Sequence, residues 1–421
     1  LSRYERMHVG RVLQAQRLRL AAEPEGQIVT FVSIHRYPVF VRFEKVPLFL
    51  NSIHVLTKER VIKTEVLLKP GDTYHRNRLA ENMRNLRELG ILNLAAAVPV
   101  LNESGEFGIL VVTRDLWSLR LESRFQTTGD FIDNFSMQLT ERNLFGRGKK
   151  VSGRFELEPL TYNTGVSYLD PRIQGKKLAL LLWGSTQFTR DENMYEGYDT
   201  DVVFYRPFYD LRQRWGFSLG LFRRDIVGRR IAQGQQLVYD DDETTDVIEA
   251  LPMGWREKTF GGSAAGRVQL GQSFIWRLKT GAGASRSRFL TDELVDLSMV
   301  SEEVANRYRR SVLPVAQTLV YPSFGASFFQ NRFHVFRNLA HFGFSEDVQV
   351  GPSGNLSVVL PREELGSTEN QFIISGYLSW REAWLGSGLA ELSGAFSTRR
   401  RASIGEFRDR KYLSRVRVAS P

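Results

Sequence analysis

The clearest alternation of hydrophobic and polar positions lies on either side of residues 143–148. Before this break, three apolar residues alternate with polar ones: Phe135, Met137 and Leu139 against Asn134, Ser136, Gln138 and Thr140. After it, Val151, Phe155 and Leu157 alternate with Ser152, Arg154, Glu156 and Glu158. A period of two predicts strands, and a glycine-rich break between two such runs predicts a hairpin. Because the polar row carries full charges, we expect a membrane barrel with lipid outside and water inside.

From residue 125 onward the same alternation recurs along the chain. In one example, Phe274, Trp276 and Leu278 alternate with Arg277 and Lys279. We count roughly twelve candidate strands up to residue 398, the first covering residues 125–140. The long polar stretches 240–246 and 292–310 are expected to be extracellular loops. No apolar run approaches the roughly 18 residues of a spanning helix, which disfavours a transmembrane helix and leaves a transmembrane barrel open.

The first 121 residues show a different pattern. Residues 1–26 are predicted to be a helical segment or linker, and residues 27–121 a small α+β domain. Its predicted elements are a strand at 28–40, a helix at 58–68 with Thr57 as N-cap, a second helix, and strands at 91–101 and 107–116. The second helix carries an apolar stripe of Leu79, Met83, Leu86 and Leu89 and ends at Gly90.

Two short motifs resemble the BamA / bacterial surface-antigen family of outer-membrane assembly barrels. Asn143, Leu144, Phe145, Gly146 and Gly148 match the family pattern N-L-F-G-x-G, and Tyr168, Asp170 and Pro171 match Y-x-D-P. The element order over residues 27–121, with its LLKPGDTY and NLRELGIL stretches, resembles a POTRA module, the periplasmic repeat of that family. The family barrel has about sixteen strands. Its V-R-G-[FY] motif is absent from this sequence, so here the chain departs from the family pattern.

The resemblance implies a function without chemical catalysis or cofactor. It implies a barrel over residues 122–421 in the bacterial outer membrane, with the POTRA domain in the periplasm. The implied activity is insertion of unfolded outer-membrane proteins, and the implied partners are these clients, membrane lipid and periplasmic accessory lipoproteins. Two alternatives remain open: secretion of a dedicated partner through the lumen, as in two-partner secretion, and a barrel that anchors a hydrolase encoded upstream of Leu1.

A barrel in lipid must pair every backbone N–H and C=O, so a weakly closed seam leaves an edge that can accept another strand. We predict that the strand at 125–140 is this gate, and Gly129 and Asp130 are compatible with a poorly held edge. The predicted gate residues are Phe131, Asn134, Phe135, Ser136, Gln138 and Thr140.

Composition adds limits to this picture. The net charge is +10, but the basic clusters are scattered over turns and strand ends without a recognition helix, so nucleic acid is not expected as a partner. The histidines form no H-x-x-x-H pair and the acidic run at 240–243 lacks EF-hand spacing, so no metal site is predicted. We find no catalytic constellation in the sequence and predict no catalytic site. The absence of cysteine fits an exported protein without disulfides. We expect the sequence to be a fragment, truncated at both ends.

Overall fold

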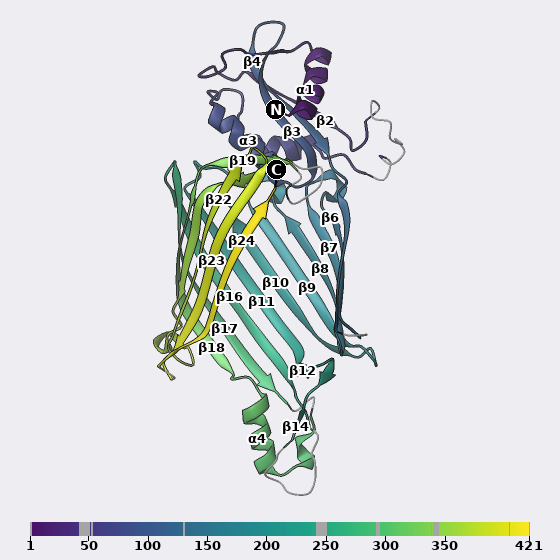
Figure 1. The fold of residues 1–421 in the computed structure, drawn as a ribbon, viewed down its shortest axis with the longest axis vertical. Helices are drawn as coiled ribbons and strands as arrows, with labels where there is room; N and C mark the ends of the chain where they lie inside the picture. The colour runs from purple at the N-terminus through teal and green to yellow at the C-terminus, as the bar shows by residue number, and fades with distance from the viewer. Residues whose placement is uncertain are drawn as a thin grey trace.

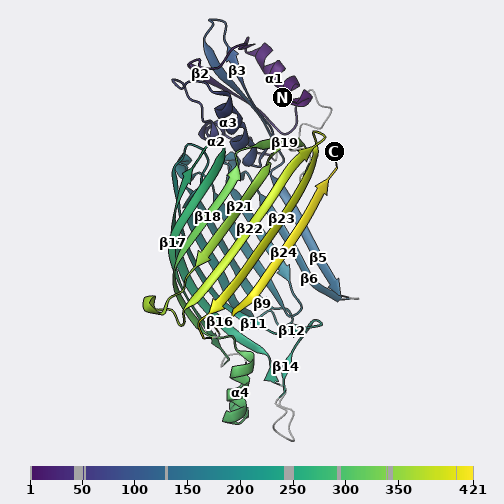
Figure 2. The same cartoon turned by 60° about the vertical axis from the view of Figure 1, so that its left-hand side comes forward.

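The computed structural model describes residues 2–41, 51, 54–128, 131–240, 251–291, 295–337, 339, 345–403 and 405–420 (Figure 1). Two sheets dominate the fold: a four-stranded sheet in the order β1-β3-β4-β2 and a fourteen-stranded one, the large sheet. We call the described residues between 2 and 116 the N-terminal module. Figures 1 and 2 show the large sheet rolled into a barrel-like wall, with the module at one end, here the proximal end, and α4 at the far end.

From β2 onward, the N-terminal module has the order strand, helix, helix, strand, strand that the sequence predicts for residues 27–121. Its elements are α1 (Arg3–Ala15), β1 (Arg19–Leu20), β2 (Phe31–Tyr37), α2 (Glu59–Glu65), α3 (Arg76–Glu88), β3 (Leu92–Leu101) and β4 (Phe107–Asp115). β3 pairs with β4 antiparallel, whereas β2 pairs with β4 parallel.

One face of this sheet is covered by α2 and α3. Leu79 and Leu86 are buried, and Met83 and Leu89 pack against the same core, which confirms the predicted stripe. Gly90 has a φ of +63°, the left-handed backbone expected at the end of a helix.

The other face is covered by α1, which lies in the segment predicted to be a helix or a linker. Val9 and Val12 are buried against strand residues that include Ala96 and Leu110. Ser2 accepts a hydrogen bond from the Glu5 N–H, and the Glu5 carboxylate accepts one from the Ser2 N–H, forming a capping box. The S-x-x-E spacing at residues 2–5 therefore indicates the start of a helix, although the apolar stripe that follows it is short.

The large sheet begins at β5, before the predicted boundary at residue 122, and each neighbouring pair in it is antiparallel. Its strands are β5 (Leu119–Thr128), β6 (Phe131–Glu141), β7 (Lys150–Leu157), β8 (Thr161–Asp170), β9 (Ala179–Thr189), β10 (Tyr195–Arg206), β11 (Trp215–Arg229), β16 (Gly254–Leu270), β17 (Phe274–Leu290), β18 (Gln317–Gln330), β21 (Gly351–Val359), β22 (Gln371–Trp384), β23 (Gly388–Arg401) and β24 (Phe407–Ala419). The prediction of roughly twelve strands ending at 398 missed β24, because six of its thirteen residues are charged and its apolar alternation is weak.

Short elements interrupt this succession. Three two-stranded sheets pair β12 (Ile231–Ala232) with β13 (Gln235–Gln236), β14 (Val238–Tyr239) with β15 (Leu251–Pro252), and β19 (Phe333–Arg337) with β20 (Ser345–Gln349). The predicted polar loop at 292–310 contains 3-10 helix η4 (Leu297–Met299) and most of α4 (Glu302–Val312), and 3-10 helix η5 (Glu363–Leu365) precedes β22. Residues 241–246 and 292–294 of the predicted loops lie outside the described residues.

The two faces of the large sheet differ in polarity as predicted. Phe274, Trp276 and Leu278 are 41%, 45% and 43% exposed on the outside. Arg277 lies on the opposite face, where its guanidinium covers the rings of Phe208 and Phe329. None of the described helices is long and apolar enough to cross a membrane.

Candidate functional site: proximal turns and sheet edges

Two proximal turns of the large sheet share one backbone geometry and carry both sequence motifs. The β6–β7 turn contains 3-10 helix η2 (Leu144–Gly146), and the β8–β9 turn contains η3 (Ile173–Gly175). In each, a non-glycine residue with positive φ (Phe145 at 54°, Gln174 at 52°) precedes a glycine with positive φ. The sequence motifs conceal this repeat, because Leu-Phe-Gly and Ile-Gln-Gly look different as letters.

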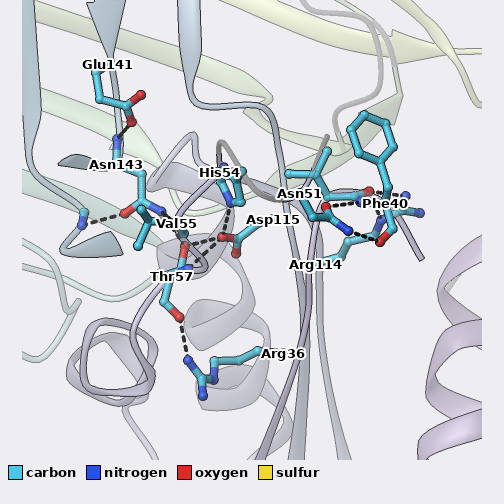
Figure 3. A network of polar contacts seen from close by, with 12 residues as sticks. Arg36, Phe40, Asn51, His54, Val55, Thr57, Arg114, Asp115, Glu141 and Asn143 are labelled. Atoms are coloured by element: carbon cyan, nitrogen blue, oxygen red, sulfur yellow. Dashed lines mark hydrogen bonds and ion pairs between the residues drawn. The ribbon is translucent and has the colours of Figure 1, made fainter. Parts of the chain in front are cut away.

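Asn143 joins the first turn to the N-terminal module. Its side-chain amide donates to Thr57 Oγ1 at 2.9 Å, and its Oδ1 accepts from the Gly148 N–H at 2.8 Å (Figure 3). The Glu141 carboxylate accepts from the Asn143 N–H at 2.7 Å. Asn143 therefore shapes its own turn and contacts the module with the same side chain.

Asp115 is the centre of this network on the module side. Its Oδ2 accepts from the Thr57 N–H at 2.7 Å and the Thr57 hydroxyl at 2.9 Å, and lies 2.8 Å from His54 Nε2 (Figure 3). The side chain is 1% exposed, so water cannot replace these contacts. The prediction that Thr57 is the N-cap of α2 is wrong, because Lys58 holds that position. The Thr57 hydroxyl instead donates a hydrogen bond to Asp115.

Gly146 lies where the backbone of the module touches the first turn. A Cβ atom at this position would stand 2.5 Å from the Leu56 carbonyl oxygen, and the Lys58 N–H donates to the Gly146 carbonyl at 2.8 Å. Its φ of +69° also favours glycine. The glycine of this motif is thus required by close approach as well as by the turn itself.

The second motif forms the matching contact on the next turn. Lys149 pairs with Asp170 at 2.8 Å and donates to Tyr168 Oη at 2.9 Å, which links the two turns. Pro171 is followed by Arg172, whose Nη2 donates to Glu65 Oε2 of α2 at 2.7 Å. The motif residues therefore lie together at the proximal end, facing α2.

α3 binds the third proximal connection, between β10 and β11. Asn85 donates to the Tyr209 carbonyl at 2.8 Å, and Glu81 accepts from the Leu211 N–H at 2.6 Å. Burial raises the pKa of Glu81, because its charged form loses solvation. Arg87 of the same helix pairs with Asp347 of β20 at 2.9 Å. Helices of the module thus contact several connections of the large sheet.

The prediction of the gate strand is wrong in its position. Phe131, Asn134, Phe135, Ser136, Gln138 and Thr140 all lie in β6. β6 is hydrogen-bonded on both sides, to β5 and to β7, so it is not an edge. The predicted strand at 125–140 covers the end of β5 and most of β6; residues 129 and 130, which separate them, lie outside the described residues.

The edges of the large sheet are β5 and β24. Within the described residues no pairing joins them, so each has one unpaired side. Apolar side chains stay exposed on both: Leu121 and Phe125 on β5 are 65% and 77% exposed, and Leu413 and Val416 on β24 are 67% and 73% exposed.

The inner face of the large sheet lines a polar cavity of about 770 Å³. Asn134, Arg154 and Glu156 line it, as their alternation predicts, together with Asp199 and Arg224 from later strands. Arg154 and Glu156 form an ion pair at 2.9 Å. No group of histidine and carboxylate side chains in the described part of the chain could hold a metal ion.

Comparison with known proteins gives matches by structure alone. Neither a family model nor a curated protein matches the sequence. A search of the solved structures returns BamA. The chain is similar to BamA from Haemophilus ducreyi lacking POTRA domains 1–3, with a TM-score of 0.34 and 9% identity, over 100% of this chain and 94% of that one. It is also similar to CdiB from Acinetobacter baumannii, with a TM-score of 0.33 and 9% identity, over 97% of this chain and 80% of that one.

The first of these two structures carries the name of the family that the sequence motifs resemble. At TM-scores this low, the likeness by itself decides no activity.

Proposed function

We propose that this chain is an outer-membrane barrel of the BamA type that assists the insertion of other β-proteins by offering them a strand edge. The observation that carries the proposal is β5, which has one unpaired side within the described residues, on a sheet with an apolar outer face. A sheet edge presents a row of free N–H and C=O groups, and an incoming strand satisfies them by β-augmentation. The mechanism requires no covalent chemistry, metal or nucleotide.

The lipid environment favours pairing of this edge with another strand. Several outward side chains are large, apolar and well exposed: Val166 at 61%, Leu221 at 67%, Leu378 at 64% and Leu392 at 62%. An outer belt of this kind is typical of a barrel wall in a bilayer. There an unpaired backbone group has no water to bind, so an open edge favours the strand that covers it.

The N-terminal module has a supporting role in this proposal. We take it to be a POTRA domain in the periplasm that delivers unfolded clients, with or without accessory lipoproteins, to the proximal end. Its β2 strand is an edge of the small sheet and offers a second place for an extended chain.

Secretion through the lumen is the second candidate. The observation that favours it is the inner cavity of about 770 Å³, whose lining includes charged and amide side chains. In that function the client crosses inside the wall, and the sheet edges stay closed.

A disulfide between the two edges separates the candidates. The chain has no cysteine, so Ser123→Cys on β5 combined with Ser414→Cys on β24 introduces the only thiol pair. Further pairs that combine position 123 with 412 or 416 cover other registers. Neighbouring strands satisfy the Cα separation of a disulfide, about 5.5 Å. The matched control is Thr140→Cys with Ser152→Cys, because these residues are already cross-strand partners in β6 and β7.

We expect the oxidised edge pair to lose insertion of an unfolded outer-membrane protein into liposomes and to regain it on reduction. The control pair should insert at the parental rate in both states. Secretion through the lumen would instead leave client passage unchanged by the edge disulfide. Normal insertion with the edge disulfide demonstrably formed would rule out strand templating.

A further inference from the structure

Two positive charges face each other directly on the inner wall of the large sheet. Arg267 of β16 and Lys279 of β17 are register partners, and Arg277 lies two residues before Lys279 on the same face. Like charges in directly opposed positions destabilise a sheet, because neighbouring side chains on one face come within a few ångströms. The arrangement therefore has a cost that the fold alone does not explain.

Other arginines on the polar face of the large sheet are paired with carboxylates. These ion pairs are Arg154 with Glu156, Arg224 with Asp199, Arg381 with Glu391, and Arg401 with Glu369. Within the described residues, no ion pair or hydrogen bond engages the charges of Arg267 and Lys279.

Arg277 has neutral neighbours in direct contact. Its Nε donates to Gln269 Oε1 at 2.9 Å, and its guanidinium lies over the rings of Phe208 and Phe329. The carboxylate that acts on it from a distance is that of Glu88, on α3. The three cations thus lack the close carboxylate partners that other inner-face arginines have.

These cations line one cavity of about 480 Å³. Its other lining residues include Tyr205, Ser327, Asn355 and Ser357 and no aspartate or glutamate. Ser327 is the register partner of Arg277 and Gly325 that of Lys279, so a small side chain and a bare backbone flank the cations. The cavity therefore combines an uncompensated positive charge with neutral hydrogen-bonding groups, which suits an anion.

The placement of the cations decides what kind of anion can reach them. They lie on the inner face, whereas their neighbours Trp276 and Leu278 point outward, so the wall separates them from lipid. Arg277 and Lys279 are themselves alternate residues of a strand, about 6.6 Å apart along it. An extended polypeptide presents every second side chain on one side with this same spacing.

We propose that Arg267, Arg277 and Lys279 form a lumenal site for an extended acidic segment of a polypeptide, with carboxylates at alternate positions. The inference rests on the proposed function in so far as it needs an unfolded client at the proximal end, and it adds a feature by which that client is recognised. Each carboxylate accepts charge-assisted hydrogen bonds from one guanidinium or ammonium group. The repulsion between Arg267 and Lys279 is relieved when the segment is bound.

Peptide binding to the full chain in detergent tests the proposal. The probe is a fluorescent eight-residue peptide of glutamate and serine in strict alternation, and its comparison peptide has the same residues ordered as Glu-Glu-Ser-Ser. The test variant is Arg267→Gln with Lys279→Gln. The matched control is Arg286→Gln with Arg288→Gln, which removes two charges from the far part of the same strand, on its other face.

We expect fluorescence anisotropy to show binding of the alternating peptide and at least about tenfold weaker binding of the comparison peptide and of the test variant. The control variant should bind as the parent does. The midpoint of thermal unfolding of the test variant should be no lower than that of the parent, because a like-charge contact has been removed. A lower midpoint would instead assign the two cations a structural role.

Three results would overturn the site: no binding, equal affinity for the two peptides, or equal losses in the test and control variants. Displacement by inorganic phosphate at the same charge concentration would indicate an adventitious ion only. The assay involves no client insertion, so its outcome is separable from that of the edge disulfide. The oxidised Ser123→Cys, Ser414→Cys variant should bind the peptide as the parent does, whether or not strand templating holds.

Discussion

At the scale of single residues, buried polar groups join the module to the large sheet. Glu81 shows the cost of such a contact. Its carboxylate must lose water to accept the Leu211 N–H, and this burial raises its pKa above the ordinary value of 4.5. The folded state therefore holds a proton on Glu81 more tightly than the unfolded state does. This contribution to stability is present below the unfolded pKa and is lost as pH rises through the folded pKa.

Glu81→Gln should separate the hydrogen bond from the charge. The amide oxygen can still accept from Leu211, but nothing is left to ionise. We expect the variant to unfold at a higher temperature than the parent at about pH 7.5, with the difference shrinking towards about pH 4. Thermal unfolding followed by circular dichroism at both pH values measures this. A variant less stable than the parent at the higher pH would show that the ionised carboxylate stabilises the contact.

At the scale of elements, α3 depends on its buried stripe. Leu86 is fully buried in the core between the helices and the small sheet. Leu86→Asp places an unpaired carboxylate there, and we expect the module to lose on the order of 3–5 kcal/mol of stability. Limited proteolysis should then cleave within residues 2–116 and leave the large sheet intact. Asn77→Asp, at an exposed position in the first turn of the same helix, is the control and should resist cleavage as the parent does.

Elements with a strong period could be predicted, and those defined by distant contacts could not. The stripe from Leu79 to Leu89 and the alternation around Trp276 gave α3 and β17 with their correct faces. β24 was missed because its pairing with β23 does not require apolar residues. The boundary between β5 and β6 was not predicted, because apolar and polar residues alternate in the same way along both strands.

The candidate site shows the same limit. The motif residues Asn143, Gly146 and Asp170 could be found in the sequence, because a family pattern contains them. Asp115, which binds Thr57, and Glu65, which binds Arg172, could not be found, since each is a single carboxylate whose importance comes from a residue far away in the chain. A buried network of this kind leaves no periodic signal.

At the scale of the whole molecule, the ion pair between Glu65 and Arg172 joins α2 to the β8–β9 turn. The Glu65 side chain is 1% exposed and that of Arg172 is 18% exposed. Glu65→Gln leaves the guanidinium without its carboxylate, and breaking such a buried pair costs about 3–5 kcal/mol. We expect faster hydrogen exchange in α2 and in residues 171–176 together, because the module separates from the turn.

Arg17→Gln provides the comparison for this experiment. It breaks an ion pair with Glu103 at 3.3 Å whose side chains are 78% and 64% exposed, and pairs of this kind contribute about 0–1 kcal/mol. Exchange should therefore stay at the parental rate. Faster exchange in α2 alone after Glu65→Gln would mean that the ion pair stabilises the helix without holding the module in place.

The order of strands in the large sheet also has a consequence for the speed of folding. Each of its pairings joins strands that follow one another in the chain, apart from the short inserted sheets. Local pairings close short loops and form early, whereas a contact between β5 and β24 would close a loop of nearly the whole sheet. Contact order thus makes any junction of these two strands the slowest to form. A stretch assembled last and held by few partners is also where the native state opens with the least free energy.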